Sequence, residues 1–341
     1  MPEIVYSKDI SVIVQGDVCK HTQKGLLSIR RFLPDAEIIL STWEGTQVDG
    51  LEYDILLLNP DPRAEVFTKS GTKNNINRQI FSTQNGLKNA TRKYALKLRS
   101  DCVLKGNKFL TYFGKYTYRN SKCKILKERV LVNTWHTRLP KQPQPLLFHP
   151  SDMFMFGLTE DLLNIWDIPL AIEPEHSMYF KNNAPVNSQY YIDGNYVRFF
   201  AEMFIWTSFL KKNNIQIEMQ DWTDCLSEKM VELSELSIIN NLCVLDYKSQ
   251  FDIVCLKYPK PHYPRVANYH FFDWFNNYEK YCDCFVLRPY EYYISAIYAF
   301  FHKIACFLIR NKKKIIRISF KKNEKYLILL GINLYKKTKI N

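Results

Sequence analysis

Short apolar runs alternate with amphipathic segments in the first half of the chain, and this alternation constrains the fold more than any other feature. Apolar residues at spacings of three and four predict helices at 26–33 and 74–93. Before, between and after these helices, β-branched and apolar runs predict strands at 10–14, 37–41, 53–58, 94–101 and 153–156. Such strand–helix–strand alternation predicts an α/β fold, with a Rossmann-type, mainly parallel sheet flanked by helices.

Polar residues follow the first predicted strand at the position where an open α/β sheet binds its ligand. In such sheets the ligand crevice lies at the carboxyl ends of the strands. Gln15 and Asp17 come directly after the apolar run 10–14. We expect them to contact a nucleotide base or ribose, although polar residues are common in loops of any function.

The fourth predicted strand ends in a second polar triplet, Arg99-Ser100-Asp101. Asp101 offers a hard oxygen ligand for Mg²⁺ or Mn²⁺, which need only one or two carboxylates when phosphate and water complete their shell. Strand alternation places Lys97 and Arg99 on the same face as Asp101, where they would add positive charge. The alternative is a solvated strand end with an Arg–Asp pair.

The predicted helix at 74–93 brings more polar groups to the same edge. Asn77, Arg78 and Gln79 supply one guanidinium and two amides. These groups suit recognition of a phosphate or a base, so we expect them to bind the nucleotide part of a donor substrate. An ordinary solvated helix face is the alternative.

Three carboxylates are candidates for a catalytic base, and one histidine is a candidate metal ligand. Asp152 and His149 precede the predicted strand at 153–156, Glu202 lies on a predicted helix at 194–212, and Asp193 comes just before that helix. Asp152 and Asp193 are equally suited to capping. Glu202 is also placed to pair with Arg198, one helical turn before it.

Charge and cysteine content narrow the class of protein. The net charge is +13, but the segment from Lys303 onward carries +11 and the rest of the chain only +2. The apolar run 292–309 has His302 and Lys303 near its middle, so we expect an interfacial amphipathic helix on anionic lipid rather than a membrane span. The tail has no recognised nucleic-acid-binding motif.

Nine scattered cysteines without a C-x-x-C pair, and no signal peptide, indicate reduced thiols in a cytoplasmic protein.

Four segments in this order resemble the WavE family of lipopolysaccharide synthesis proteins. They are N-R-Q-I-x-S-T-x-x-G-L (77–87), Y-A-L-K-L-R-S-D (94–101), S-D-M-F-M-F-G (151–157) and A-E-M-F-I-W (201–206). The resemblance covers about 10–212 and implies a glycosyltransferase-A-like fold. By this similarity Ser100-Asp101 takes the place of a metal-binding D-x-D element, but Arg99 stands at its first position, so Arg99 is a candidate to neutralise phosphate directly.

Together these observations predict a nucleotide-sugar-dependent glycosyltransferase at the inner face of the cytoplasmic membrane. Its acceptor would be a lipid-linked saccharide in lipopolysaccharide or other surface-polysaccharide synthesis. We expect a catalytic domain at 1–285, with a donor-binding half at about 8–105 and an acceptor-side half at about 146–285, followed by a basic, membrane-associating helical tail at 286–341. The alternative is a non-catalytic protein that binds a nucleotide or saccharide and tethers an assembly complex to the membrane.

Overall fold

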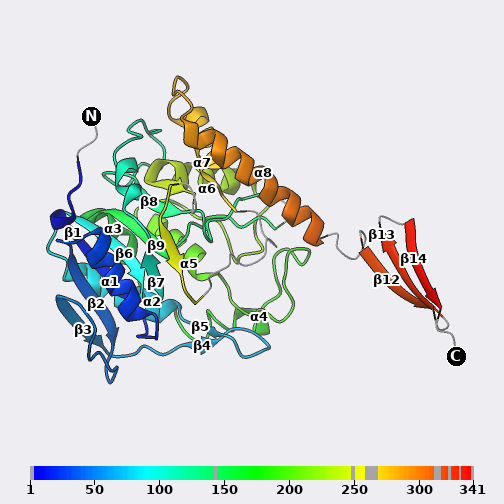
Figure 1. Ribbon diagram of the computed structural model, residues 1–341, viewed down its shortest axis with the longest axis horizontal. Coiled ribbons are helices and arrows are strands. Elements are labelled where there is room, and N and C mark those ends of the chain that lie inside the picture. Colours follow the sequence, from blue (N-terminus) through cyan, green and yellow to red (C-terminus); the bar gives the residue numbers. More distant parts are fainter. Residues whose placement is uncertain are drawn as a thin grey trace.

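The computed structural model describes residues 4–141, 144–246, 250–257, 268–310, 316–321, 324–329 and 332–338. A seven-stranded sheet lies at its centre, flanked by helices (Figure 1). The strands of this sheet are β1 (Ile10–Gln15), β2 (Glu37–Trp43), β3 (Ile55–Asn59), β6 (Tyr94–Arg99), β8 (Val130–Asn133), β9 (Phe154–Leu158) and β10 (Leu242–Leu245).

The spatial order of the sheet is β10-β8-β9-β6-β1-β2-β3. Every neighbouring pair is parallel except those made by β9, which runs antiparallel to both β6 and β8. The predicted α/β class and the five predicted strands are therefore confirmed. The chain runs from β1 outward to β3 and then returns to the other side of β1 with β6, so the strand order reverses between β1 and β6.

Helices α1 (Thr22–Phe32) and α2 (Ile76–Lys88) connect these parallel strands and pack closely against them. A Cβ at Gly86 in α2 would lie 2.3 Å from Cγ2 of Ile13, so α2 packs tightly on β1. A Cβ at Gly25 in α1 would lie 2.6 Å from the carbonyl oxygen of Cys102. Only glycine permits this approach of α1 to β7 (Cys102–Leu104), which pairs with β11 (Ile253–Cys255).

The second half of the chain adds further helices to the body, and the first of these packs against α2. They are α3 (Thr159–Trp166), α4 (Tyr179–Asn182), α5 (Ala201–Lys212), α6 (Glu228–Asn241) and α7 (Phe271–Tyr281). Short 3₁₀ helices η1 (Ser7–Asp9) and η2 (Lys108–Tyr112) and the small hairpin of β4 (Glu65–Val66) and β5 (Lys73–Asn74) complete the body. Helix α5 begins at Ala201 rather than at the predicted residue 194, because residues 195–200 are extended or bent before it.

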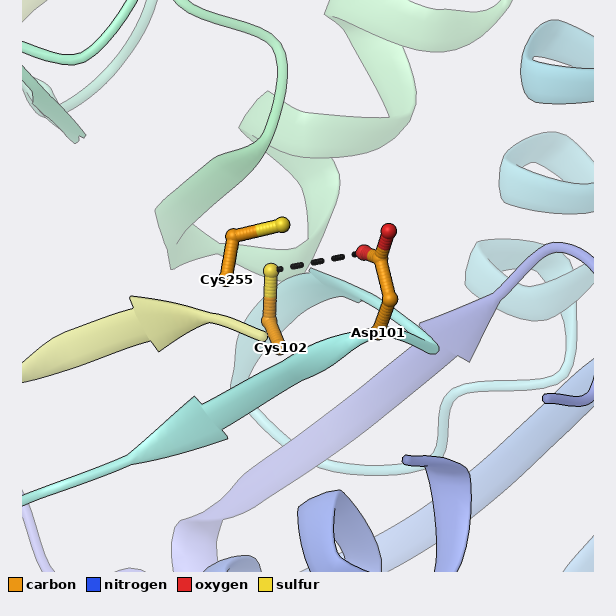
Figure 2. A group of neighbouring side chains, drawn as sticks. All are labelled: Asp101, Cys102 and Cys255. Carbon is orange, nitrogen blue, oxygen red and sulfur yellow. Dashed lines mark hydrogen bonds between the residues drawn. The ribbon is translucent and has the colours of Figure 1, made fainter. Parts of the chain in front are cut away.

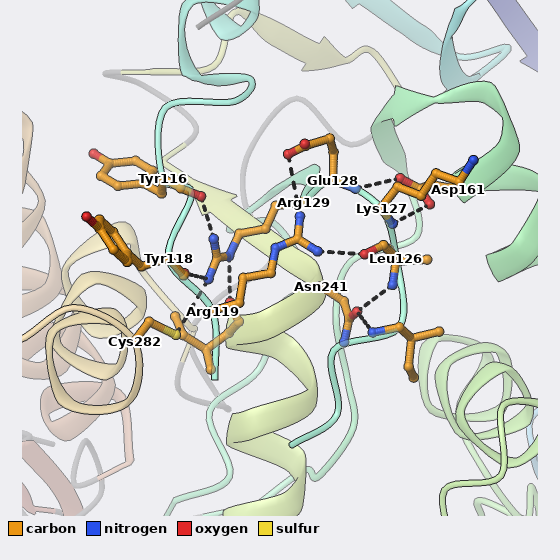
Figure 3. A network of polar contacts seen from close by, with 12 residues as sticks. Tyr116, Tyr118, Arg119, Leu126, Lys127, Glu128, Arg129, Asp161, Asn241 and Cys282 are labelled. Atoms are coloured by element: carbon orange, nitrogen blue, oxygen red, sulfur yellow. Dashed lines mark hydrogen bonds and ion pairs between the residues drawn. The ribbon is translucent and has the colours of Figure 1, made fainter. Parts of the chain in front are cut away.

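A buried arginine joins the helices of this half to the loop that leads into β8 (Figure 3). Arg129 donates hydrogen bonds to the carbonyl oxygens of Ile239 at 2.7 Å and Tyr118 at 2.7 Å, and also to that of Tyr116. Its guanidinium carbon lies 5.0 Å from the ring centre of Tyr278 on α7. Backbone carbonyls and an aromatic face thus compensate the burial of this charge.

The C-terminal region combines a helix with strands. Helix α8 (Tyr290–Arg310) confirms the helical part of the predicted tail, and no helix among the described residues is long and apolar enough to cross a bilayer. Strands β12 (Ile316–Lys321), β13 (Glu324–Leu329) and β14 (Ile332–Thr338) then form an antiparallel sheet, so the helical prediction is wrong for this part. Apolar and polar residues alternate in I-R-I-S-F-K, which is the period of a strand.

Candidate functional site

A cavity opens at the carboxyl ends of β1 and β6, where the strand order reverses. This position is the expected ligand crevice of an open α/β sheet. The cavity has a volume of about 350 Å³ and draws its walls from five parts of the chain that are far apart in sequence. Its lining residues are Gln15, Gly16, Asp17, Val18, Cys19, Trp43, Asn75, Arg78, Gln79, Arg99, Ser100, Asp101 and Lys257.

Arg99 and Asp101 form a two-pronged ion pair in the wall of this cavity. Arg99 Nε donates to Oδ1 of Asp101 at 3.0 Å, and Nη2 donates to Oδ2 at 2.7 Å. Burial alone would raise the pKa of Asp101, but the hydrogen bonds and charge of Arg99 lower it below its ordinary value. The carboxylate therefore stays ionised, and it holds the guanidinium in a fixed orientation at the cavity wall.

Two thiols lie beside this carboxylate (Figure 2). Cys102 and Cys255 are opposite each other on β7 and β11, and both thiols are buried and outside any disulfide. Cys102 Sγ lies 3.7 Å from Oδ1 of Asp101, and a ligand atom of each of the three residues lies within 4.8 Å of the others. The hydrogen bond with Cys255, and then burial, raise the pKa of Cys102 well above its ordinary value.

The donor set at Asp101 does not fit the Mn²⁺ or Mg²⁺ that the family resemblance implies. Both carboxylate oxygens already accept hydrogen bonds from Arg99, and the neighbouring ligand atoms are sulfur. Mg²⁺ and Mn²⁺ prefer oxygen ligands. His149, the second predicted metal ligand, lies elsewhere: its Nδ1 is 2.9 Å from the carbonyl oxygen of His136, and its Nε2 is 3.7 Å from Glu202.

The loop after β1 is tied to the end of β6 and to the end of β2. Ser100 Oγ donates to the carbonyl oxygen of Asp17 at 2.6 Å, and Trp43 Nε1 donates to the Asp17 carboxylate at 2.5 Å. Gln15 accepts from Ser82 of α2 at 3.0 Å. Gly16 allows the sharp turn between them, because its φ of +108° is strained for any other residue. Hydrogen bonds therefore hold the loop after β1 in place where it lines the cavity.

The first turn of α2 supplies a second arginine to the cavity. Arg78 donates to both oxygens of Asp61, at 2.7 Å and 2.5 Å, and its guanidinium carbon lies 6.0 Å from the Trp43 ring centre. Lys257, which follows β11, adds a third cationic side chain to the lining. Arg78, Arg99 and Lys257 thus place three cationic groups in the cavity lining, beside the carboxylates of Asp17 and Asp101.

A buried group of titratable residues lies next to the cavity wall. Gln79 lines the cavity and donates to Oδ2 of Asp152 at 2.5 Å. Burial and the charge of Asp152 raise the pKa of Glu202 to about 8. Burial, and then the positive charge of Arg138, lower the pKa of His149 to about 3. At neutral pH, Glu202 is therefore largely protonated and His149 is neutral.

The sequence profile of the WavE lipopolysaccharide synthesis family matches residues 10–306. The chain belongs to the WavE family. The match extends beyond the four segments of the resemblance and reaches into α8. No curated protein matches this chain. A solved structure titled as the inositol-1-phosphate CTP transferase from T. maritima is similar over 71% of this chain and 100% of that chain, with 7% sequence identity and a TM-score of 0.32.

In this WavE-family chain, seven of the nine residues expected to bind the donor line the cavity. They are Gln15, Asp17, Arg78, Gln79, Arg99, Ser100 and Asp101. Asn77 does not, because its buried amide makes two hydrogen bonds with the backbone of Ala171, at 3.0 Å and 2.8 Å. Lys97 is fully buried, and its ammonium group bonds the carbonyl oxygen of Asp152 and lies 4.7 Å from the Trp166 ring centre.

The three expected bases of this WavE-family chain have different surroundings. Asp152 and Glu202 lie close together, as the effect of Asp152 on the pKa of Glu202 indicates. Asp193 is exposed in the turn before Gly194, whose carbonyl oxygen accepts from the amide of Lys69. It lines none of the described cavity and does not cap α5, which begins eight residues later.

Several residues that line this cavity of the WavE-family chain were not predicted from the sequence. Trp43 ends β2, so the rule that strand ends face the ligand would have included it. Asn75 lies just before α2, at its N-cap position. Lys257 had no local signal, because β11 reaches the site through its pairing with β7, which is about 150 residues away in sequence.

Proposed function

We propose that this chain is a glycosyltransferase that moves a sugar from a nucleotide-sugar donor to a lipid-linked saccharide in lipopolysaccharide or other surface-polysaccharide synthesis. Its membership of a lipopolysaccharide synthesis family supports this class of pathway. The observation that carries the proposal is the cavity at the β1–β6 strand ends, where Asp101 holds the Arg99 guanidinium in the wall and the Arg78 guanidinium lies beside an aromatic side chain, Trp43. Such a cavity suits a nucleoside diphosphate.

The cationic lining would stabilise the leaving group. In the proposed reaction the acceptor oxygen bonds to the anomeric carbon, and the bond from that carbon to the diphosphate oxygen breaks. The nucleoside diphosphate leaves with the electron pair of the broken bond. Arg78, Arg99 and Lys257 would stabilise this developing negative charge, while the Asp101 carboxylate keeps Arg99 in place.

We assign the acceptor proton to the buried carboxyl pair. In its ionised form, Glu202 would accept the proton that the acceptor hydroxyl loses. Its raised pKa makes it a stronger base than an exposed glutamate. Asp152 would position this group, since Gln79 connects it to the cavity wall. None of the three candidates lines the described cavity, but Asp193 is the weakest, because its side chain is exposed and, among the described residues, no contact such as that of Gln79 with Asp152 connects it to the cavity wall.

A lipid-linked acceptor requires the enzyme to work at the membrane. We therefore place the protein at the inner face of the cytoplasmic membrane, with residues 1–285 as the catalytic domain. The concentration of positive charge after Lys303 supports this location, because anionic lipid attracts each basic residue near the surface by about 1 kcal/mol.

A second candidate function is non-catalytic binding of a nucleotide or saccharide. The ion pair between Arg99 and Asp101 favours it, because both oxygens of that carboxylate already accept hydrogen bonds from Arg99 and the ligand atoms beside it are sulfur. Incubating the purified protein with a panel of nucleotide sugars, and measuring nucleotide release and sugar transfer, separates the two functions. Turnover that is lost in Asp101→Ala supports the transferase. Saturable donor binding without any nucleotide release supports the binding protein.

A further inference from the structure

Helix α8 packs only one of its faces on the body of the protein. Tyr292, Ser295 and Ala299 are 7%, 0% and 2% exposed and face α7. Ser295 Oγ accepts from the amide of Phe272 at 2.7 Å, and Tyr292 donates to Asn276 at 3.0 Å. These contacts fix the rotation of α8 about its axis, and so determine which side chains point away from the body.

The opposite face of α8 is a continuous apolar surface, which we call the outer face. Its residues recur at spacings of four and three, so they form one stripe along the helix. They are Tyr293 (54% exposed), Ile297 (58%), Phe300 (60%), Phe301 (61%), Ile304 (38%) and Phe307 (61%). A contiguous exposed surface of this kind marks a contact with a partner or a membrane.

Basic residues accompany the outer face. Lys303 is exposed on the helix itself. Arg310 ends the helix, and the sequence continues with Lys312, Lys313 and Lys314. An apolar, aromatic helix face followed in sequence by such a charge cluster is the composition of a helix that lies in the headgroup region of an anionic bilayer. Parallel pairing with a second copy would bring two such clusters together, and like charges in an interface oppose association.

We propose that the outer face of α8 is inserted in the plane of an anionic membrane. The helix lies along the edge of the body in Figure 1, so it can contact a flat surface over its length. This inference deepens the proposed function, because it assigns the membrane contact that a lipid-linked acceptor requires. It also assigns different roles to two parts of the region: aromatic side chains insert, and basic residues attract.

Vesicle co-sedimentation of the full-length protein tests the proposal. The vesicles are phosphatidylcholine alone, or phosphatidylcholine with phosphatidylglycerol. We expect binding to the anionic vesicles, and at least about tenfold weaker binding by the outer-face variant Phe300→Ser/Phe301→Ser/Phe307→Ser. The matched control, Ile4→Ser/Tyr118→Ser/Leu226→Ser, removes three apolar side chains that are 70%, 64% and 60% exposed elsewhere on the body, and should bind like the wild type.

A tryptophan probe gives a second readout that a general loss of structure would not imitate. The Phe301→Trp variant should show stronger quenching by brominated lipid than the wild-type protein does. Equal vesicle binding by the outer-face variant and the wild type would overturn the proposal. A wild-type dimer in light scattering that becomes a monomer in the outer-face variant would also overturn it. These assays use no donor or acceptor, so their result is independent of the proposed catalytic activity.

Discussion

The Arg99 guanidinium and the Asp101 carboxylate make two parallel hydrogen bonds, at 3.0 Å and 2.7 Å, in the wall of the β1–β6 cavity. The carboxylate is almost fully buried, with 8% of its side chain exposed, whereas the arginine retains 30%. The exposed part of the pair is therefore cationic. This arrangement presents positive charge to the cavity at a position where the family resemblance implies a metal-binding carboxylate.

Removing divalent metal should leave the reaction largely intact. The positive side chains of Arg78, Arg99 and Lys257 already line the cavity, and both oxygens of Asp101 accept hydrogen bonds from Arg99. We expect nucleotide release from the donor to change less than about threefold when EDTA is added. A loss of turnover in EDTA that Mn²⁺ restores would show that the Arg99–Asp101 pair opens to bind metal.

Replacing Glu202 with glutamine should lower the transfer rate by about 100-fold or more. The wild-type rate should rise with pH through about 8, because burial and Asp152 raise the pKa of Glu202 to about 8 and the base acts in its ionised form. This rise should be absent from the residual activity of Glu202→Gln. An unchanged pH profile in the variant would remove Glu202 from the mechanism.

The same carboxyl group links stability to pH, so it provides a structural control for that experiment. Its pKa is raised from an ordinary value of 4.5, so the folded chain binds the proton more tightly than the unfolded chain. The resulting stabilisation is fully present below pH 4.5 and is lost as pH rises through about 8. Denaturant unfolding should show this decline in the wild type and a smaller decline in Glu202→Gln.

Two neighbouring residues of α2 should behave differently when each is replaced by alanine. Asn77→Ala leaves the buried backbone groups of Ala171 without partners and should lower the free energy of unfolding by about 1–3 kcal/mol. Arg78→Ala removes a cation from the cavity and should weaken donor binding by about tenfold or more. Denaturant unfolding and calorimetric titration with the donor measure these effects. The reverse assignment would show that Asn77, not Arg78, contacts the donor.

The sheet and the position of the site could be predicted because their determinants are local. The β-branched run before Gln15 and the apolar run before Arg99 each specify a buried strand and its end. Once both strands are parallel neighbours, their polar ends must meet, as the pairing of Gln15 with Arg99 confirms. Asp101 and Arg78, which the sequence places at one crevice, therefore do line the same cavity.

Whether an individual side chain lines the cavity depends on distant segments that pack against it, and the local sequence pattern does not specify these contacts. Alternation put Lys97 on the same face as Arg99, but Trp166 of α3 covers Lys97 and excludes it from the cavity. Asn77 is drawn inward by the backbone of Ala171, 94 residues later. The strands at 316–338 were missed because their high charge favoured a solvated helical tail over their period-two alternation.

The most direct test of the central claim is the specificity constant, kcat/KM, for a nucleotide-sugar donor in Arg99→Gln. The matched control is Arg30→Gln, which breaks another Arg–Asp pair, with Asp54 at 2.6 Å, away from the cavity. Denaturant unfolding must first show that Arg99→Gln is folded, since it leaves the buried Asp101 unpaired. We predict that kcat/KM falls by about 100-fold in Arg99→Gln and is unchanged in Arg30→Gln. A folded Arg99→Gln protein with the wild-type kcat/KM would contradict the assignment of this cavity to the donor diphosphate.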